Sequence, residues 1–244
     1  MAQVQLLLAH LDRMAFRSSK LIDKKLIPTY WPTILCGDFN CSNTSKLYEF
    51  IVESKLKNYK ELNRNNLSGQ FHRINSVKQI EYTILPEHIG VSDQSQFKIE
   101  VEERFKKVSN DKDDDLEIYC SYGSSHLRHK FAFKSAYKHY NENNELEITS
   151  IVGDEPKKTV DYIFYHSEIR KEICENIIDY KNEQDENDTV SKKRGNNYAE
   201  NNINELELIA TLELFTINQL DDIYLPNENY PSDHFLLAAK FELN

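Results

Sequence analysis

An apolar run from Thr33 to Cys36 leads directly into the polar sequence Gly37-Asp38-Phe39-Asn40. A short apolar run of this kind is typical of a buried strand, which needs other layers of secondary structure to cover it. The flanking sequence predicts helices on both sides. Residues 2–16 place apolar side chains at the three-and-four spacing of one helix face, and residues 46–52 do the same after cap-type residues. The order helix, strand, loop, helix therefore predicts a mixed α and β fold.

Asp38 and Asn40 lie two residues apart at the end of this predicted strand. Side chains at that spacing project into the same crevice. A carboxylate there can take a proton from an attacking water or hold a hard cation, while the amide donates a hydrogen bond to a phosphoryl oxygen. A plain turn, in which Asp and Asn bond their own backbone, has the same sequence pattern. The segment by itself leaves both interpretations open.

A second polar segment, Ser232-Asp233-His234, opens the predicted strand 234–243. Neighbouring residues point apart on a strand, so Asp233 is poorly placed to orient His234. Asp161 is the better candidate. It interrupts the apolar run 160–165, where a buried carboxylate is costly unless it is paired. The alternative is an aspartate on an edge strand that faces water.

The remaining sequence divides into ordered and polar stretches. Residues 57–130 predict a polar, partly mobile insertion, and residues 181–202 predict a disordered loop because they contain almost nothing to bury. Further order is expected over residues 131–140, with strands at 147–152, 159–165, 205–215 and 234–243. The histidines of the middle region, His126, His129 and His139, form no ligand pattern and are expected to be solvent-facing or structural.

Length, charge and cysteine content narrow the classes of protein. A chain of 244 residues fits one domain or a large piece of one. Its net charge of −10 argues against broad adhesion to nucleic acid but leaves room for a locally basic cleft. The four cysteines have neither zinc-site nor disulfide-framework spacing. Without a membrane-length apolar run or a signal sequence, we expect an intracellular protein in the cytoplasm, with the nucleus as the alternative.

The three polar segments, in this order, resemble the endonuclease/exonuclease/phosphatase superfamily, which includes deoxyribonuclease-like nucleases and messenger-RNA deadenylases. Within it the chain is similar to the Angel proteins, relatives of the carbon catabolite repressor deadenylases and nocturnin. The likeness is to the C-terminal half of such a protein. The segments that carry it are Gln3 to Ala9, Cys36 to Asn40, Leu47-Tyr48, Thr159 to Tyr165, Leu225 to Asn229 and Ser232 to His234.

The resemblance implies an α+β fold, a four-layered α/β/β/α sandwich of which residues 1–244 form the C-terminal part. It also implies a hydrolase of RNA 3′ ends that depends on magnesium, with manganese as the alternative. The reaction would be 3′-5′ exonuclease or deadenylase activity, or removal of a 2′,3′-cyclic phosphate. Asp38 would activate the water, Asn40 would bind the scissile phosphate, and Asp161 would orient His234, which stabilises the phosphoryl charge. Asp233 would lie close to the metal. DNA and membranes are not expected partners.

Two departures from the family pattern bear on function. The main metal-holding glutamate of the family comes from the first half, so this chain alone is expected to be weak or inactive and to expose an apolar sheet face. The adenine-stacking aromatic of the deadenylases is replaced by Glu155-Pro156-Lys157-Lys158. That change puts poly(A) preference in doubt, while Lys157 and Lys158 could bind phosphates. The rival interpretation is a non-catalytic, RNA-related interaction module, or a truncated isoform or pseudoenzyme, and the sequence does not identify protein partners.

Overall fold

The computed structural model describes residues 1–22, 25–62, 85–108, 122–153, 156–166, 206–220 and 223–244. These residues form a mixed α and β fold, as predicted. The helices are α1 (Ala2–Ala15), α2 (Lys46–Glu53) and α4 (Lys98–Val108), with short 3-10 helices η1 (Tyr59–Glu61), η2 (Glu87–Ile89) and η3 (Ile217–Leu220). The strands are β1 (Phe16–Ile22), β2 (Lys25–Tyr30), β3 (Thr33–Asp38), β4 (Lys55–Leu56), β5 (Leu127–Arg128), β6 (Lys134–Ser135), β7 (Asp161–His166), β8 (Leu206–Thr211) and β9 (Ala239–Leu243).

Strand β7 lies at the centre of the sheet that carries the polar segments. It pairs antiparallel with β3 along its whole length, from Thr33 opposite His166 to Asp38 opposite Asp161. On its other edge it pairs with the short strand β6. The two predicted strands therefore exist, and their register brings two carboxylates to one end of the sheet.

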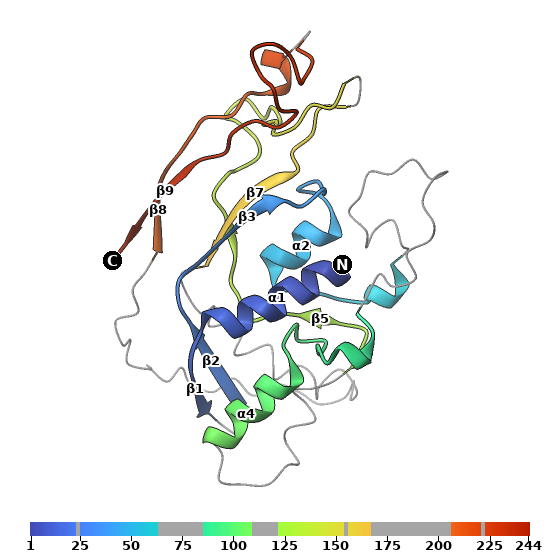
Figure 1. Ribbon diagram of the computed structural model, residues 1–244, viewed down its shortest axis with the longest axis vertical. Coiled ribbons are helices and arrows are strands. Elements are labelled where there is room, and N and C mark those ends of the chain that lie inside the picture. Colours follow the sequence, from blue (N-terminus) through green and yellow to red (C-terminus); the bar gives the residue numbers. More distant parts are fainter. Residues whose placement is uncertain (23–24, 63–84, 109–121, 154–155, 167–205, 221–222) are drawn as a thin grey trace, which may run out of the picture.

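Alternate residues of β7 enter two different cores. Tyr162 and Phe164 are buried together with α1 and α2, whereas Ile163 and Tyr165 pack against the β8–β9 hairpin. The Tyr165 ring lies 5.2 Å from that of Phe241 on β9. Figure 1 shows the same order of layers, with the helices on one side of β3 and β7 and the hairpin on the other. A strand that is covered on both faces explains the continuous apolar run in its sequence.

Helix α1 confirms the helix predicted at residues 2–16, but its buried face is different. Val4 and Leu8 are buried as expected, whereas Leu7 and Met14 are 36% and 77% exposed. The polar residue Asp12 is buried in their place, at 2% exposure. The helix is therefore rotated toward a polar interaction that apolar periodicity does not reveal.

The hairpin of β1 and β2 and the helix α4 were not predicted. Pro28 lies within β2, opposite Ser19. Among the described residues β2 pairs only with β1, and an edge strand tolerates a proline. Helix α4 belongs to the expected insertion 57–130 and packs through Val101 on Leu26 of β2. Residues 63–84 and 109–121 of that insertion, and the predicted loop 181–202, lie outside the described residues.

The later strands are shorter than predicted. Residues 147–152 form isolated β-bridges instead of a continuous strand. Ser150, for example, forms one bridge with Lys158 and another with His234. Strand β9 begins at Ala239, so the polar segment that ends at His234 precedes the strand instead of opening it. A register shift between Leu208 and Ala210 interrupts the alternating pattern expected for β8.

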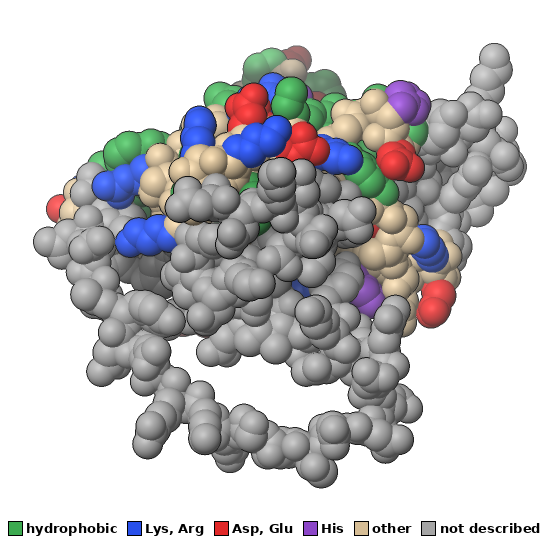
Figure 2. Space-filling view, turned by 90° about the horizontal axis from the view of Figure 1, so that it is seen from below, with side chains coloured by type: hydrophobic (Ala, Val, Ile, Leu, Met, Phe, Trp, Pro, Cys, Tyr) green, Lys and Arg blue, Asp and Glu red, His purple; other side chains and the backbone are tan. Residues whose placement is uncertain are grey.

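The surface at the α4 end of the molecule mixes both signs of charge. Figure 2 shows Lys and Arg side chains interspersed with Asp and Glu on the coloured part of this face. An ion pair joins α1 to α4, because Arg13 Nε lies 2.7 Å from Glu100 Oε1. Over the described ranges, no helix combines the length and apolar character that crossing a membrane requires.

A buried ion pair joins α1 to α4 and the β1–β2 hairpin. Arg104 Nη1 lies 2.7 Å from Asp12 Oδ2, and both side chains are at most 4% exposed. The Asp12 carboxylate also accepts hydrogen bonds from the Tyr30 hydroxyl and from Gln96 Nε2. The Arg104 guanidinium covers the Phe16 ring at 3.9 Å. These contacts explain why a polar residue occupies the buried face of α1.

We expect Asp12→Ala to lower the free energy of unfolding by about 3–5 kcal/mol, because it leaves the Arg104 charge buried without its partner. Urea unfolding at pH 7.5 measures this value. Glu102→Ala is the matched control, since the atoms of the Lys98–Glu102 pair on α4 are 3.9 Å apart and the side chains are 51% and 30% exposed. The control should change stability by less than about 1 kcal/mol. Equal losses in the two variants would show that burial of the ion pair does not matter.

His129 is a structural histidine, as expected. Its Nε2 donates to the Phe50 carbonyl at 2.9 Å, and its Nδ1 accepts from the Phe131 amide at 3.2 Å. This pair of bonds needs a neutral imidazole, because a protonated ring has no acceptor. Burial lowers the pKa of His129 to about 4. His139 is likewise buried, and burial lowers its pKa to about 4.

Stability should therefore fall as the pH drops. Between a pKa of 6.5 in the unfolded chain and about 4 in the folded one, the unfolded chain binds more protons at His129. The contribution of His129 is complete above pH 6.5 and decreases by about 2 kcal/mol at pH 5. Unfolding of the wild type and of His129→Leu at pH 7.5 and pH 5 measures this effect. The wild type should lose about 2 kcal/mol more of its free energy of unfolding than His129→Leu does between pH 7.5 and pH 5. Equal losses in the two proteins would contradict the assignment.

Candidate active site

The loop after β3 carries the first two predicted site residues. The Asn40 amide N–H donates to Asp38 Oδ1 at 2.8 Å, and Asn40 Nδ2 donates to Asp38 Oδ2 at 3.2 Å. Asn40 adopts a positive φ of 48°, a conformation that asparagine tolerates better than most residues. The local turn is therefore present, and both side chains nevertheless remain accessible to solvent. The turn holds the two groups ready and does not compete with a functional role.

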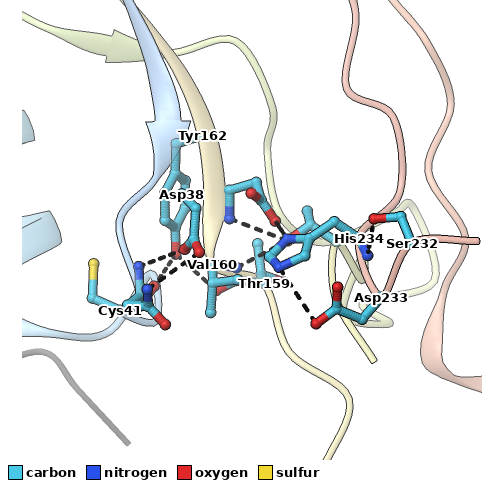
Figure 3. A network of polar contacts seen from close by, with 11 residues as sticks. Asp38, Cys41, Thr159, Val160, Tyr162, Ser232, Asp233 and His234 are labelled. Carbon is cyan, nitrogen blue, oxygen red and sulfur yellow. Dashed lines mark hydrogen bonds and ion pairs between the residues drawn. The ribbon is translucent and has the colours of Figure 1, made fainter. Parts of the chain in front are cut away.

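The Tyr162 hydroxyl fixes this loop against the start of β7. It lies 2.8 Å from the Cys41 carbonyl and 3.0 Å from the Thr159 carbonyl, two acceptors that share its single proton. The Phe39 amide also donates to the Val160 carbonyl at 2.9 Å. Figure 3 shows Tyr162 with Cys41 and Thr159, its partners in the two segments. Nothing in the sequence marked this hydroxyl, because Tyr162 resembles one more apolar residue of the buried strand.

Asp161 and His234 form the pair that the sequence suggested. Asp161 Oδ2 lies 2.8 Å from His234 Nδ1, and the two side chains are 18% and 32% exposed. Asp161 does not face water, because its side chain is mostly buried and bonded to His234. One ligand-type atom from each of Asp38, Asp161 and His234 lies within 4.8 Å of the others. The structure thus brings three chain segments together at one point.

Asp233 takes a different position relative to the imidazole. Its Oδ2 lies 3.9 Å from His234 Nε2, too far for a hydrogen bond, and its side chain is 43% exposed. The preceding Ser232 hydroxyl accepts the His234 amide at 3.0 Å, which shapes this short turn. Asp233 therefore faces solvent beside the second ring nitrogen, whereas Asp161 binds the first.

The environment of His234 favours its charged form. Burial is the largest single influence and lowers the pKa of His234, but the hydrogen bond and negative charge of Asp161, together with the charges of Asp233 and Asp38, outweigh it. The net result is a pKa raised above the ordinary value. A protonated ring donates from both nitrogens. With Nδ1 bound to Asp161, the Nε2 proton is available to a negatively charged substrate group.

The two predicted phosphate-binding lysines behave differently. Lys157 Nζ donates to the Leu220 carbonyl of η3, which turns it toward the fold. Lys158 is paired with Ser150, and Ser150 is also paired with His234. Residues directly opposite each other in antiparallel pairs place their side chains on the same face. The register therefore puts Lys158, and not Lys157, on the face that carries His234.

Comparison with known proteins gives one consistent relationship, although no protein-family model matches the chain. The chain is 29% identical to Protein angel homolog 2 of Homo sapiens over 250 aligned residues, covering 100% of this chain and 41% of that protein. It is 30% identical to the Mus musculus protein of the same name, over 87% of this chain and 36% of that one. The chain thus spans less than half the length of these curated relatives.

A solved structure shows the same relationship. The crystal structure of ANGEL2, a 2′,3′-cyclic phosphatase, in complex with adenosine-2′,3′-vanadate, superposes with a TM-score of 0.60 at 28% sequence identity. The match covers 99% of this chain and 51% of that chain. The chain is therefore homologous to Angel homolog 2, and its α+β architecture is that of the endonuclease/exonuclease/phosphatase superfamily, over about half of the solved chain.

We expect Asp161→Asn to lower the pKa of His234, because it removes both the charge and the best acceptor of Nδ1–H. A titration of the His234 ring signals by NMR measures this change. Asp233→Asn is the matched control. It should lower the pKa less, since Asp233 acts only through its charge at 3.9 Å. A larger decrease of the pKa in Asp233→Asn would contradict the assignment, because Asp233 and not Asp161 would then be the main partner of the His234 ring.

Proposed function

We propose that this homologue of Angel homolog 2 supplies the Asp38, Asn40, Asp161 and His234 side chains of a phosphoester hydrolase that removes a 2′,3′-cyclic phosphate from RNA 3′ ends. The observation that carries the proposal is the convergence of Asp38 with the hydrogen-bonded pair Asp161–His234 at the same end of β3 and β7. The groups come from segments far apart in sequence, and they meet where the surface is open to solvent.

Asp38 is the group that receives the proton of the attacking water. In the first hydrolysis the water oxygen bonds to phosphorus, one of the two phosphorus–oxygen bonds to the ribose breaks, and the departing ribose oxygen takes up a proton from solvent. The product is a phosphate monoester. A second hydrolysis of the same kind breaks the remaining bond to the ribose and releases inorganic phosphate. The carboxylate of Asp38 is exposed, and its orientation is fixed by two hydrogen bonds from Asn40. A base held in this way needs little reorganisation before the reaction.

His234 and Asn40 stabilise the charge that develops on the phosphoryl oxygens. Asp161 holds the imidazole through Nδ1 and favours its protonated form, so that Nε2–H can donate to such an oxygen. The Asn40 amide group has a second proton that is not used in the bond to Asp38. Lys158, on the face of His234, binds a phosphate of the RNA backbone and positions the end of the strand.

Magnesium fits part of this donor set, because Mg²⁺ prefers oxygen ligands and the site offers carboxylate oxygens. Asp233 would help to hold the ion, since Asp161 Oδ2 is already bonded to His234 and Asp38 acts as the base. When bound, the ion would neutralise charge on the phosphoryl group. Mg²⁺ takes about six ligands, and the described residues supply fewer carboxylate oxygens than that at this site. The ion would therefore need further ligands.

Two observations support a cyclic phosphate over poly(A) as the substrate. The solved homologue is a 2′,3′-cyclic phosphatase seen with adenosine-2′,3′-vanadate. The aromatic residue expected of the deadenylases is replaced by the sequence around Lys157 and Lys158, of which Glu155 lies outside the described residues. A terminal cyclic phosphate needs charge stabilisation and no stacked adenine, and that is the chemistry of the residues present.

Exposed apolar side chains bear on how much activity the chain has alone. They lie on β3, on and directly after β8, and before β9, namely Ile34, Ile209, Leu212 and Leu236, at 44% to 74% exposure. The relatives are more than twice as long as the matched region. We therefore expect slow turnover from this chain and design the assay to detect it.

Asp38→Asn should reduce hydrolysis of a 2′,3′-cyclic-phosphate RNA oligonucleotide by about 10²–10⁴-fold, because the variant has no base for the water. Single-turnover assays with excess protein and magnesium measure the rate. A 3′-phosphate oligonucleotide and a poly(A) oligonucleotide with a free 3′ hydroxyl are the comparison substrates. Equal rates for wild type and Asp38→Asn, or faster loss of the poly(A) strand, would refute the proposed reaction. Tight RNA binding without hydrolysis would favour the interaction module.

Lys158→Ala should raise KM for the same RNA severalfold, since it removes one phosphate contact. Lys157→Ala is the matched control, because Lys157 is turned toward the Leu220 carbonyl, and it should leave KM unchanged. Steady-state measurement at two salt concentrations separates the two lysines. If Lys157→Ala has the larger effect on KM, the assignment from the register is wrong.

A further inference from the structure

We propose that Thr149 is a positioning residue that holds Asp161 and His234 at the separation their hydrogen bond requires. This inference deepens the proposed function and rests on it, because it concerns the same site. Thr149 is fully buried, with 0% exposure. It reaches no substrate and acts through the main chain of its two neighbours.

The Thr149 side chain binds the start of β7. Its Oγ1 accepts hydrogen bonds from the amides of Val160 at 2.9 Å and of Asp161 at 3.1 Å. Strand β6, on the same sheet, pairs with β7 only further along, at Phe164 and Tyr165. At the end of β7 that carries the site, one hydroxyl oxygen therefore serves two consecutive amides. A hydroxyl has two lone pairs, so both bonds can form at once.

The Thr149 main chain binds the other segment of the site. Its carbonyl accepts the Phe235 amide at 2.8 Å, and two residues later the Ile151 amide donates to the Asp233 carbonyl at 2.8 Å. These two bonds lie on either side of His234. The position of the imidazole relative to residues 149–151 is therefore fixed by the backbone.

Thr149 thus connects the segment of Asp161 with the segment of His234, two residues that are 73 positions apart in the sequence. The side-chain oxygen sets the place of Asp161, and the main-chain oxygen sets the place of His234. Removal of the hydroxyl leaves the Val160 and Asp161 amides buried without an acceptor. The start of β7 should then shift to find other partners, and a hydrogen bond weakens steeply when its distance and angle change.

The test compares Thr149→Ser with Thr149→Ala in the full chain. Both variants lose the threonine methyl group, and they differ only in the hydroxyl. Hydrogen exchange of the Val160 and Asp161 amides reports the side-chain bonds, and exchange of the Phe235 amide is the internal reference. The NMR signal of the His234 Nδ1 proton reports the bond to Asp161. None of these readouts requires catalytic activity, so failure of the proposed function leaves them interpretable.

Thr149→Ala should exchange the Val160 and Asp161 amides about tenfold faster than wild type and lose the Nδ1 proton signal, while Phe235 changes little. Thr149→Ser should retain the wild-type behaviour. A Thr149→Ala protein that keeps the Nδ1 signal would overturn the proposal. If Thr149→Ala does not fold, Thr149→Val, which keeps the side-chain volume, takes its place with the same expectations. Loss of folding in both would also overturn it, because the hydroxyl would then hold the fold and not the site.

Discussion

The antiparallel pairing of β3 with β7 determines most of what this structure can do. It places Asp38 opposite Asp161 and presents alternate residues of β7 to two separate cores. A slip of one residue would exchange the faces of β7, sending Tyr162 and Phe164 toward the β8–β9 hairpin. The register that buries the aromatic side chains is thus the same register that brings the two carboxylates together. Packing and chemistry are specified by one set of hydrogen bonds.

The site is held by polar contacts that belong to the interior. The Tyr162 hydroxyl ties the Asp38 loop to β7, and the Thr149 hydroxyl ties β7 to the segment of His234. Each hydroxyl is buried next to the more exposed site groups. Each bonds two backbone groups near the end of β7, carbonyls in the case of Tyr162 and amides in the case of Thr149. A buried hydroxyl is costly unless it is bonded, so these side chains are confined to one arrangement.

Patterns in the sequence predicted the parts of the fold in which local periodicity and burial agree. Helices α1 and α2 and strands β3 and β7 were predicted because apolar side chains dominate their contacts. The β1–β2 hairpin and α4 were missed, since polar contacts to the Asp12 carboxylate, from Arg104 of α4 and Tyr30 of β2, join them to α1 in place of an apolar stripe. The pairing of Asp161 with His234 was inferred from the cost of an unpaired carboxylate. The distinction between Lys157 and Lys158 depends on register, which composition does not carry.

The separation of the site residues along the chain has a consequence for folding. The bond from Tyr162 to Cys41 spans 121 positions, and that from His234 to Asp161 spans 73. Such nonlocal contacts have a high contact order, and their loops lose entropy before any contact repays it. Helices α1 and α2, built from local contacts, can form long before these bonds close. The Asp161–His234 bond is therefore expected to form late in folding, once both cores are in place.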